Sequence, residues 1–146
     1  MPSLHAACIA LCDAGILIRG PSGSGKSSLA VLLASEADGA FVADDRVLCD
    51  RRGDLLSARA HEALCGQVEI RGQGILSVAD LGLAIRPEAI VRLTIDLVAE
   101  SPRLPEPPAD AEILGLPIPR LILDRGVRRA GLAPLLIRAA LRKQRP

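Results

Sequence analysis

The sequence predicts an α/β fold organised around a phosphate-binding loop. Residues 20–27 match the pattern G-x-x-x-x-G-K-[ST], preceded by an apolar, strand-like run and followed by a run rich in leucine and alanine. This order of strand, glycine-rich loop and helix is the context in which the pattern binds phosphate. Residues 90–98 alternate apolar and polar side chains, as a half-buried strand does. With 146 residues, the chain fits a single domain over residues 1–146.

The elements next to the loop can be predicted in chain order. Two apolar runs, 6–11 and 15–19, are separated by turn-forming residues and predict a pair of strands. Residues 27–37 have good helix propensity, and Gly39 predicts the end of this helix as a glycine stop. Further strands are expected at 40–43, 47–50 and 55–58.

The second half of the sequence is less regular. Residues 68–78 combine β-branched side chains with two glycines, and residues 101–119 contain six prolines, which predict an irregular connection. A short strand is expected at 121–123. Residues 132–143 then predict a helix, in which Pro134 is tolerated because it lies in the first turn.

Composition argues against several classes of function. The formal net charge is only +1, and Phe41 is the sole aromatic residue, so we expect neither a nucleic-acid nor a membrane partner. Cys8 and Cys12 are expected at buried strand positions, and the spacing of the four cysteines does not indicate zinc. We expect no signal peptide or transmembrane helix, and free thiols favour a cytoplasmic location.

The residue types in the loop explain its expected chemistry. Its glycines let backbone N–H groups converge on phosphate oxygens, and the following helix adds the positive end of its dipole. Lys26, one of only two lysines, supplies a charge for the terminal phosphates, and Ser27 is placed to bind the Mg²⁺ that bridges them. The residues expected to bind the phosphates of a cofactor are Gly20, Pro21, Ser22, Gly23, Ser24, Gly25, Lys26 and Ser27.

Acidic residues are expected beside this loop. Asp44 and Asp45 end the predicted strand 40–43, and ligands of α/β sheets bind at the carboxyl ends of strands. Adjacent side chains point to opposite sides, so one carboxylate could hold metal while the other accepts a proton from an attacking hydroxyl. A pair that only caps the strand is the alternative. Glu69 and Arg71, followed by two glycines, could serve metal and phosphate together.

Three motifs together resemble the HPr kinase/phosphorylase family of bacterial enzymes. The chain has GPSGSGKSS at 20–28, VADDRV at 42–47 and VEIRGQGILSV at 68–78, in the family's order and near its spacing. The resemblance covers most of the chain and corresponds to the catalytic domain, without the N-terminal domain of longer members. It implies a P-loop α/β domain with a mixed sheet and flanking helices, similar to phosphoenolpyruvate carboxykinase and often assembled as a hexamer.

The resemblance also implies a bifunctional enzyme. Such an enzyme phosphorylates a serine of an HPr-type phosphocarrier protein with ATP, and it reverses the reaction by attack of inorganic phosphate, which releases pyrophosphate. The segment 125–129 matches a basic segment that the family uses in dephosphorylation. Carried over by position, the catalytic residues are His5, Lys26, Asp44, Asp45 and Arg103, and the residues that hold Mg²⁺ are Ser27 and Glu69.

Other functions fit the same motifs. A small-molecule kinase is one alternative, although we recognise no arginine-rich lid segment in the sequence. A non-catalytic, ATP-binding regulator is another, and it would leave Asp44 and Asp45 idle. A third alternative is a kinase that has lost phosphorolysis. Substitution of the acidic pair distinguishes the regulator from the enzymes.

Overall fold

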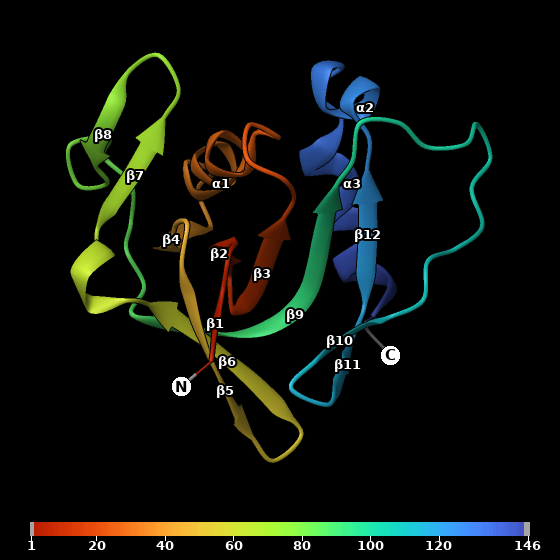
Figure 1. The fold of residues 1–146 in the computed structure, drawn as a ribbon, viewed down its shortest axis with the longest axis horizontal. Helices are drawn as coiled ribbons and strands as arrows, with labels where there is room; N and C mark the ends of the chain where they lie inside the picture. Colours follow the sequence, from red (N-terminus) through yellow and green to blue (C-terminus); the bar gives the residue numbers. More distant parts are fainter. Residues whose placement is uncertain (1, 145–146) are drawn as a thin grey trace.

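The computed structural model describes residues 2–144 and forms a curled mixed sheet with helices on one face (Figure 1). The sheet has eight strands in the order β1-β5-β6-β9-β3-β2-β4, with β12 also paired to β9. This arrangement confirms the predicted mixed α/β fold. The strands are β1 (Ser3–Leu4), β2 (Ala7–Leu11), β3 (Ala14–Arg19), β4 (Gly39–Ala43), β5 (Val47–Arg52), β6 (Leu55–Ala60), β9 (Glu88–Leu97) and β12 (Arg120–Leu123).

The parallel part of the sheet sets the position of the loops. β9 runs parallel to both β3 and β12, so the carboxyl ends of these three strands lie at one edge. Arg19 at the end of β3 donates two hydrogen bonds to Asp96 near the end of β9, at 2.8 and 2.9 Å. Paired, charge-assisted bonds of this kind fix the geometry of the strand ends. The glycine-rich loop leaves the sheet at this edge, which is the upper edge in Figure 1.

Helix α1 (Lys26–Ala34) follows the loop and covers the sheet. It ends before Ser35, whose hydroxyl donates to the carbonyl of Leu32 at 2.6 Å, so the predicted end at residue 37 and the predicted glycine stop were wrong. Gly39 instead begins β4. Glycine is needed there because a Cβ would collide with the backbone of Leu33 and Ala34 at the end of the helix.

Strand β2 is buried on both faces and contributes to two hydrophobic clusters. Ala7, Ile9 and Leu11 face the cluster beneath α1, whereas Cys8 and Ala10 face the cluster on the opposite side. This alternation follows from the two-residue period of a strand. Cys8 is therefore buried as predicted, but the prediction for Cys12 was wrong. Cys12 is exposed in the β2–β3 turn, where its φ is 51°.

Two hairpins lie outside the main sheet. β7 (Gln67–Ile70) and β8 (Gly74–Ser77) form one hairpin, which buries Val68 in the cluster beneath α1. β10 (Ala111–Ile113) and β11 (Leu116–Ile118) form the other, which covers the opposite face of the sheet. The prolines of segment 101–119 predicted an irregular connection, but the structure has two strands within it, so this prediction was wrong for the β10–β11 hairpin. Pro117 is tolerated because a two-stranded hairpin has free edges.

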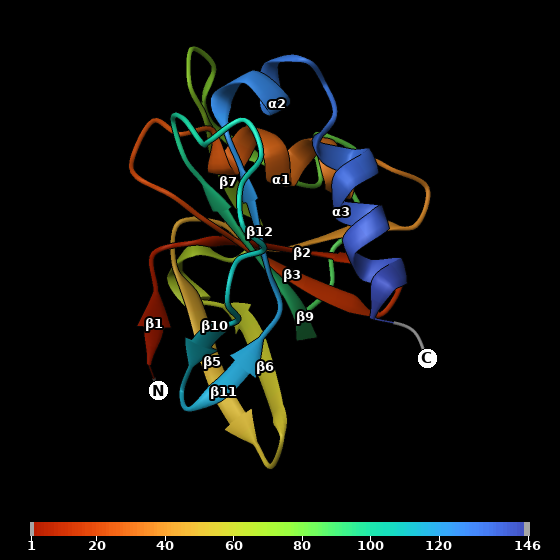
Figure 2. The ribbon, with the colours of Figure 1, turned by 90° about the vertical axis from the view of Figure 1, so that its right-hand side faces the viewer.

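The remaining elements are three helices. The short 3₁₀ helix η1 (Glu62–Leu64) precedes β7, while α2 (Arg125–Arg129) and α3 (Ala133–Lys143) follow β12. Figure 2 shows α1, α2 and α3 toward the upper end of the molecule, with strands β5 and β6 of the sheet and the β10–β11 hairpin at the lower end. Pro134 lies in the first turn of α3, as predicted. Among residues 2–144, no helix is both long and apolar enough to cross a membrane.

Candidate active site

The glycine-rich loop borders a cavity of about 510 Å³ that collects most of the predicted site residues. We call it the acidic cavity. Its walls come from the loop, the start of α1, the end of β4, the β7–β8 hairpin and the segment before β2. It is lined by His5, Ser22, Gly23, Gly25, Lys26, Ser27, Ser28, Asp44, Asp45, Glu69 and Arg71.

The ammonium of Lys26 is bound by backbone carbonyls of the glycine-rich loop. Gly23 and Gly25 have φ angles of 80° and 95°, a left-handed conformation that glycine adopts without a steric cost. The chain can therefore curl around the ammonium of Lys26, which donates to the carbonyl of Gly20 at 2.7 Å and of Pro21 at 3.2 Å. The side chain is 9% exposed. A phosphate group could replace these two neutral acceptors with anionic oxygens, which accept stronger hydrogen bonds.

Asp44 connects three elements through one buried carboxylate. The hydroxyl of Ser27 in α1 donates to Oδ1 of Asp44 at 2.7 Å. The backbone N–H of Glu69 in β7 donates to Oδ2 at 3.2 Å. Asp44 itself follows β4 and is 6% exposed. Its position is therefore fixed from both sides of the cavity.

Asp45 has a different environment from its neighbour. Its side chain is 67% exposed, and its Oδ1 lies 3.2 Å from Nδ1 of His5. The φ angle of Asp45 is 65°, a left-handed value that turns the backbone just before β5. His5 reaches the same place because Leu4 of β1 pairs with Val47, the first residue of β5. The pairing of two strands thus brings histidine and carboxylate together.

The β7–β8 hairpin contributes Glu69 and Arg71. Glu69 is exposed at the cavity, and Arg71 begins the turn after β7. Nη1 of Arg71 lies 3.3 Å from the point that a Cβ on Gly23 would occupy, so the guanidinium faces the loop directly. In the part of the chain that the structure describes, Arg71 makes no side-chain hydrogen bond or ion pair. Its donors are available to an anion bound in the loop.

The oxygen donors of the cavity fit a magnesium ion that is shared with phosphate. Ser27, Asp44 and Glu69 supply a hydroxyl and two carboxylates. Within residues 2–144, no group of three His, Cys, Asp or Glu side chains is close enough to enclose a metal. The hydroxyl and the two carboxylates suit Mg²⁺, which usually takes one or two carboxylates and completes its shell with water and substrate phosphates.

One predicted residue lies apart from the others. Arg103 is exposed in the connection after β9 and does not line the acidic cavity. It also does not line a second cavity, described below, on the other side of the glycine-rich loop. In Figure 1 this connection loops outward beyond β12.

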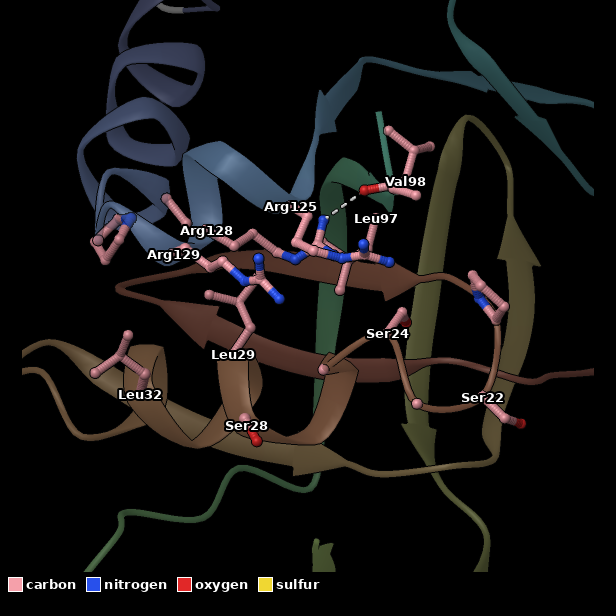
Figure 3. Close-up of a pocket in the computed structure, with 17 residues that line it drawn as sticks. Ser22, Ser24, Ser28, Leu29, Leu32, Leu97, Val98, Arg125, Arg128 and Arg129 are labelled. Carbon is pink, nitrogen blue, oxygen red and sulfur yellow. Dashed lines mark hydrogen bonds between the residues drawn. The ribbon is translucent and has the colours of Figure 1, made fainter. Parts of the chain in front are cut away.

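The arginines of α2 lie beside the loop, a placement that the family resemblance suggested but that no local pattern in the sequence predicts. Arg125, Arg128 and Arg129 line a second cavity, on the other side of the loop from Asp44 and Asp45 (Figure 3). We call it the arginine cavity. The family resemblance had matched the run RGVRR at 125–129 to a basic segment used in dephosphorylation, and in the structure this run is a helix capped by Asp124.

Comparison with known proteins gives a consistent result. Residues 1–145 match the family model described as HPr Serine kinase C-terminal domain. The chain is 35% identical over 147 residues to an HPr kinase/phosphorylase of Burkholderia lata and 34% identical to one of Burkholderia cenocepacia, covering 96% of this chain in both cases. It spans about half the length of these relatives, 45% of each. A solved structure of the Hpr(Ser) kinase/phosphatase from Coxiella burnetii superposes with a TM-score of 0.81 at 28% identity, over 98% of this chain and 90% of that one.

Proposed function

Because the chain belongs to the HPr serine kinase C-terminal domain family, we propose that it phosphorylates a serine of an HPr-type phosphocarrier protein with ATP and reverses this reaction with inorganic phosphate. In this proposal, residues 20–27 are a P-loop that holds the ATP phosphates, in a fold of the phosphoenolpyruvate carboxykinase type. The observation that carries it is the acidic cavity, where a phosphate-binding cation, Lys26, meets an exposed carboxylate, Asp45.

Asp45 is the proposed proton acceptor in the forward step. It takes the proton of the carrier's serine hydroxyl while that oxygen attacks the γ-phosphorus of ATP. The bond between the γ-phosphorus and the β,γ-bridging oxygen breaks, and ADP leaves. His5, 3.2 Å from Asp45, orients its carboxylate, and Lys26 and Arg71 stabilise the charge that spreads over the transferring phosphoryl oxygens.

The reverse step uses the same groups in opposite roles. An oxygen of inorganic phosphate attacks the phosphorus of the carrier's phosphoserine, and the new bond yields pyrophosphate. The serine oxygen leaves and takes a proton from Asp45. One cavity can perform both directions because the phosphorus is displaced in line, with the carrier's oxygen on the side of Asp45 in each case.

The proposed magnesium site consists of Ser27, Asp44 and Glu69. The ion supplies positive charge to the phosphates and neutralises charge that develops on them. The protein's part is to keep the ligands in place, which the hydrogen bonds of Asp44 accomplish from two directions. Asp44 is therefore assigned to metal and Asp45 to the proton.

The setting of the enzyme completes the proposal. The four cysteines are free, which suits a reducing cytoplasm, and we place the protein there. Inorganic phosphate and pyrophosphate are small-molecule partners in this proposal, and the family resemblance adds assembly of several copies, up to a hexamer. Size-exclusion chromatography with light scattering measures the number of copies.

The test follows the mass of the carrier protein. The purified chain is incubated with ATP, Mg²⁺ and the HPr-type carrier from the same genome, and the intact mass of the carrier is recorded before and after inorganic phosphate is added. We expect the mass of one phosphoryl group to appear and then to disappear with release of pyrophosphate. The Lys26→Ala variant should give neither change.

Other outcomes identify the alternatives. A gain of mass that phosphate does not reverse would leave a kinase without phosphorolysis. Tight ATP binding without any gain would refute the carrier as substrate, and would leave a small-molecule kinase or a regulator. ATPase and substrate screens then separate these two.

A further inference from the structure

The glycine-rich loop begins where an ion pair joins the ends of two parallel strands. Arg19 and Asp96 are direct partners in the register of β3 and β9. The guanidinium of Arg19 donates to both carboxylate oxygens of Asp96, at 2.8 and 2.9 Å. Gly20, the first residue of the loop, follows Arg19 directly in the chain. The carboxylate of Asp96 therefore holds the residue from which the loop starts.

A second arginine reaches the same carboxylate from the third parallel strand. Nε of Arg120, the first residue of β12, lies 3.5 Å from Oδ2 of Asp96. Figure 1 shows β3, β9 and β12 ending at one edge of the sheet. The side chains of Arg19, Asp96 and Arg120 are at most 31% exposed. Two positive charges thus share one half-buried carboxylate, and its removal would leave them around an uncharged side chain.

The next residue of β9 fixes the loop by packing. A Cβ on Gly20 would lie 3.1 Å from the Cβ of Leu97 and 3.2 Å from the carbonyl oxygen of Leu97. It would also lie 2.6 Å from Oγ of Ser24 in the middle of the loop. The backbone of Gly20 is therefore enclosed between the end of β9 and the loop itself. Consecutive residues of β9 thus hold the start of the loop, Asp96 through Arg19 and Leu97 through Gly20.

The place of Gly20 matters because its carbonyl binds the cation of the site. Lys26 donates to this carbonyl at 2.7 Å, the shorter of its two hydrogen bonds. A continuous series of contacts therefore runs from Asp96 through Arg19 and Gly20 to the ammonium of Lys26. Neither Arg19 nor Asp96 lines the acidic cavity, so any effect of the pair on chemistry must pass through the loop.

We propose that Asp96 is a positioning residue for phosphoryl transfer, which acts through Arg19 to set where the first residue of the loop and the ammonium of Lys26 lie. The inference rests on the proposed role of Lys26 in phosphoryl transfer, but not on the identity of the phosphate acceptor. It gives a part in the reaction to a residue that lies outside the cavity and outside the loop.

The sequence itself supplies a probe for the position of Lys26. Lys26 and Lys143 are the only lysines of the chain. When lysine is labelled with ¹³C, the ε-methylene groups should give two NMR signals, and the Lys143→Arg variant assigns them. The signal of Lys26 then reports the surroundings of its ammonium without any carrier protein.

The variants separate the proposed contact from a general loss of charge on β9. The signal of Lys26 is recorded for the wild type, Asp96→Asn, Arg19→Gln and the double variant. Glu88→Gln is the matched control, because Glu88 lies at the other end of β9 and also accepts two hydrogen bonds from an arginine, Arg52. Circular dichroism checks that each variant folds.

Asp96→Asn should shift the signal of Lys26 by more than its line width, because an amide offers Arg19 one acceptor atom where the carboxylate offers two. Arg19→Gln should shift the signal in the same direction. The double variant should shift it no further than the larger single change, since both residues act through one contact. Glu88→Gln should leave it in place.

Two results would overturn the inference. One is a Lys26 signal that stays in place in the single variants, and the other is a pair of shifts that add in the double variant. If Asp96→Asn did not fold, Arg19→Gln would still decide between these outcomes, because it breaks the same contact from the other side.

The kinetics of the carrier assay give a second measurement. Asp96→Asn should lower kcat about tenfold, because displacement of a reacting group by a fraction of an ångström is costly. KM for ATP should change less than about threefold, since Lys26 acts most strongly on the charge of the transition state. A loss of kcat that only matched the loss of folded protein would make Asp96 a structural residue and refute the positioning role.

Failure of this inference can be distinguished from failure of the proposed function. If the Lys26 signal moves as expected but the wild type adds no phosphate to the carrier, the positioning of Lys26 stands and the proposed acceptor fails. If the carrier is phosphorylated while the signal stays in place in the variants, the proposed function stands and the positioning role fails.

Discussion

Nδ1 of His5 lies 3.2 Å from Oδ1 of Asp45, in the cavity that also contains Lys26. Both side chains of the pair are more than half exposed, at 57% and 67%. The neighbouring Asp44 is buried, and both of its oxygens accept hydrogen bonds from the protein. In the proposed function, the exposed carboxylate is therefore the one assigned to the serine of a docked carrier, and the buried one is assigned to the metal.

The first prediction concerns Asp45. Asp45→Asn should lower the rate of carrier phosphorylation by about 10²- to 10⁴-fold, because an amide cannot accept the serine proton. The affinity for ATP should change less than about twofold, since Asp45 does not hold the nucleotide phosphates. Initial rates and calorimetry measure the two quantities. Asp54→Asn, in the exposed turn between β5 and β6, is the control. Full activity of Asp45→Asn would assign the proton to another group.

The second prediction concerns Asp44. Asp44→Asn should remove most of the strengthening of ATP binding by Mg²⁺, because an amide is a much poorer ligand for this ion. It should also destabilise the fold by about 1 kcal/mol, since the backbone N–H of Glu69 loses a charged acceptor. ATP titrations with and without Mg²⁺, and urea denaturation, test both effects. An unchanged dependence on Mg²⁺ would contradict the assignment.

The third prediction concerns Arg71. Because its guanidinium faces the loop at Gly23, Arg71→Ala should slow transfer in both directions by about 10²-fold or more. Arg71→Lys should recover only part of this loss, since an ammonium cannot contact two phosphate oxygens in the same planar arrangement. Arg59→Ala, exposed on β6, controls for loss of a positive charge. If Arg71→Lys restored the full rate of transfer, Arg71 would contribute only its positive charge and not its planar arrangement of donors.

The fourth prediction concerns stability against pH. Hydrogen bonds from Arg138 lower the pKa of Asp38 from 3.8 to about 2. A lowered folded-state pKa stabilises the fold above the unfolded-state value, and this contribution is lost as the pH falls through the folded-state value. Asp38→Asn should therefore lower the free energy of unfolding at pH 7.

The same pKa sets where that difference disappears. The wild type and Asp38→Asn should approach each other as the pH falls from 3.8 and converge below about pH 2, because only below the folded-state pKa is Asp38 neutral in both states. Urea denaturation at a series of pH values measures this. Asp110→Asn, on the exposed connection before β10, should follow the wild type throughout. A difference that persists well below the folded-state pKa would show that Asp38 contributes by packing instead of charge.

The sequence predicted best those elements whose conformation depends on neighbouring residues in the chain. The strand, loop and helix around residues 20–27 could be predicted because a glycine-rich turn, a lysine and a leucine-rich run are adjacent in sequence. The predicted end of α1 was three residues too late, because Gly39 is required by its contact with the end of α1 and not by a left-handed turn. The β10–β11 hairpin was not predicted because the prolines of the segment indicated an irregular connection. Its turn is formed by Leu114 and Gly115, which have φ angles of 51° and 80°.

Contacts between distant segments were harder to predict. The pairing of β1 with β5 brings His5 to Asp45, and no periodicity within either segment encodes that pairing. The resemblance to a known family supplied His5. Divided environments for Asp44 and Asp45 were expected because adjacent side chains point to opposite sides, but which of the two is buried emerges only from the structure. The location of α2 beside the loop depends on the parallel pairing of β12 with β9, which is likewise a property of the whole sheet.

The left-handed backbone at Asp45 has an evolutionary consequence. At a φ of 65°, Asp, Asn and Gly are the residues tolerated best, and of these only Asp can accept a proton. A lineage that abandons phosphoryl transfer but keeps nucleotide binding could thus substitute Asp45→Asn or Asp45→Gly with little cost to folding. Among descendants of this protein, those two replacements would be the signature of a pseudoenzyme.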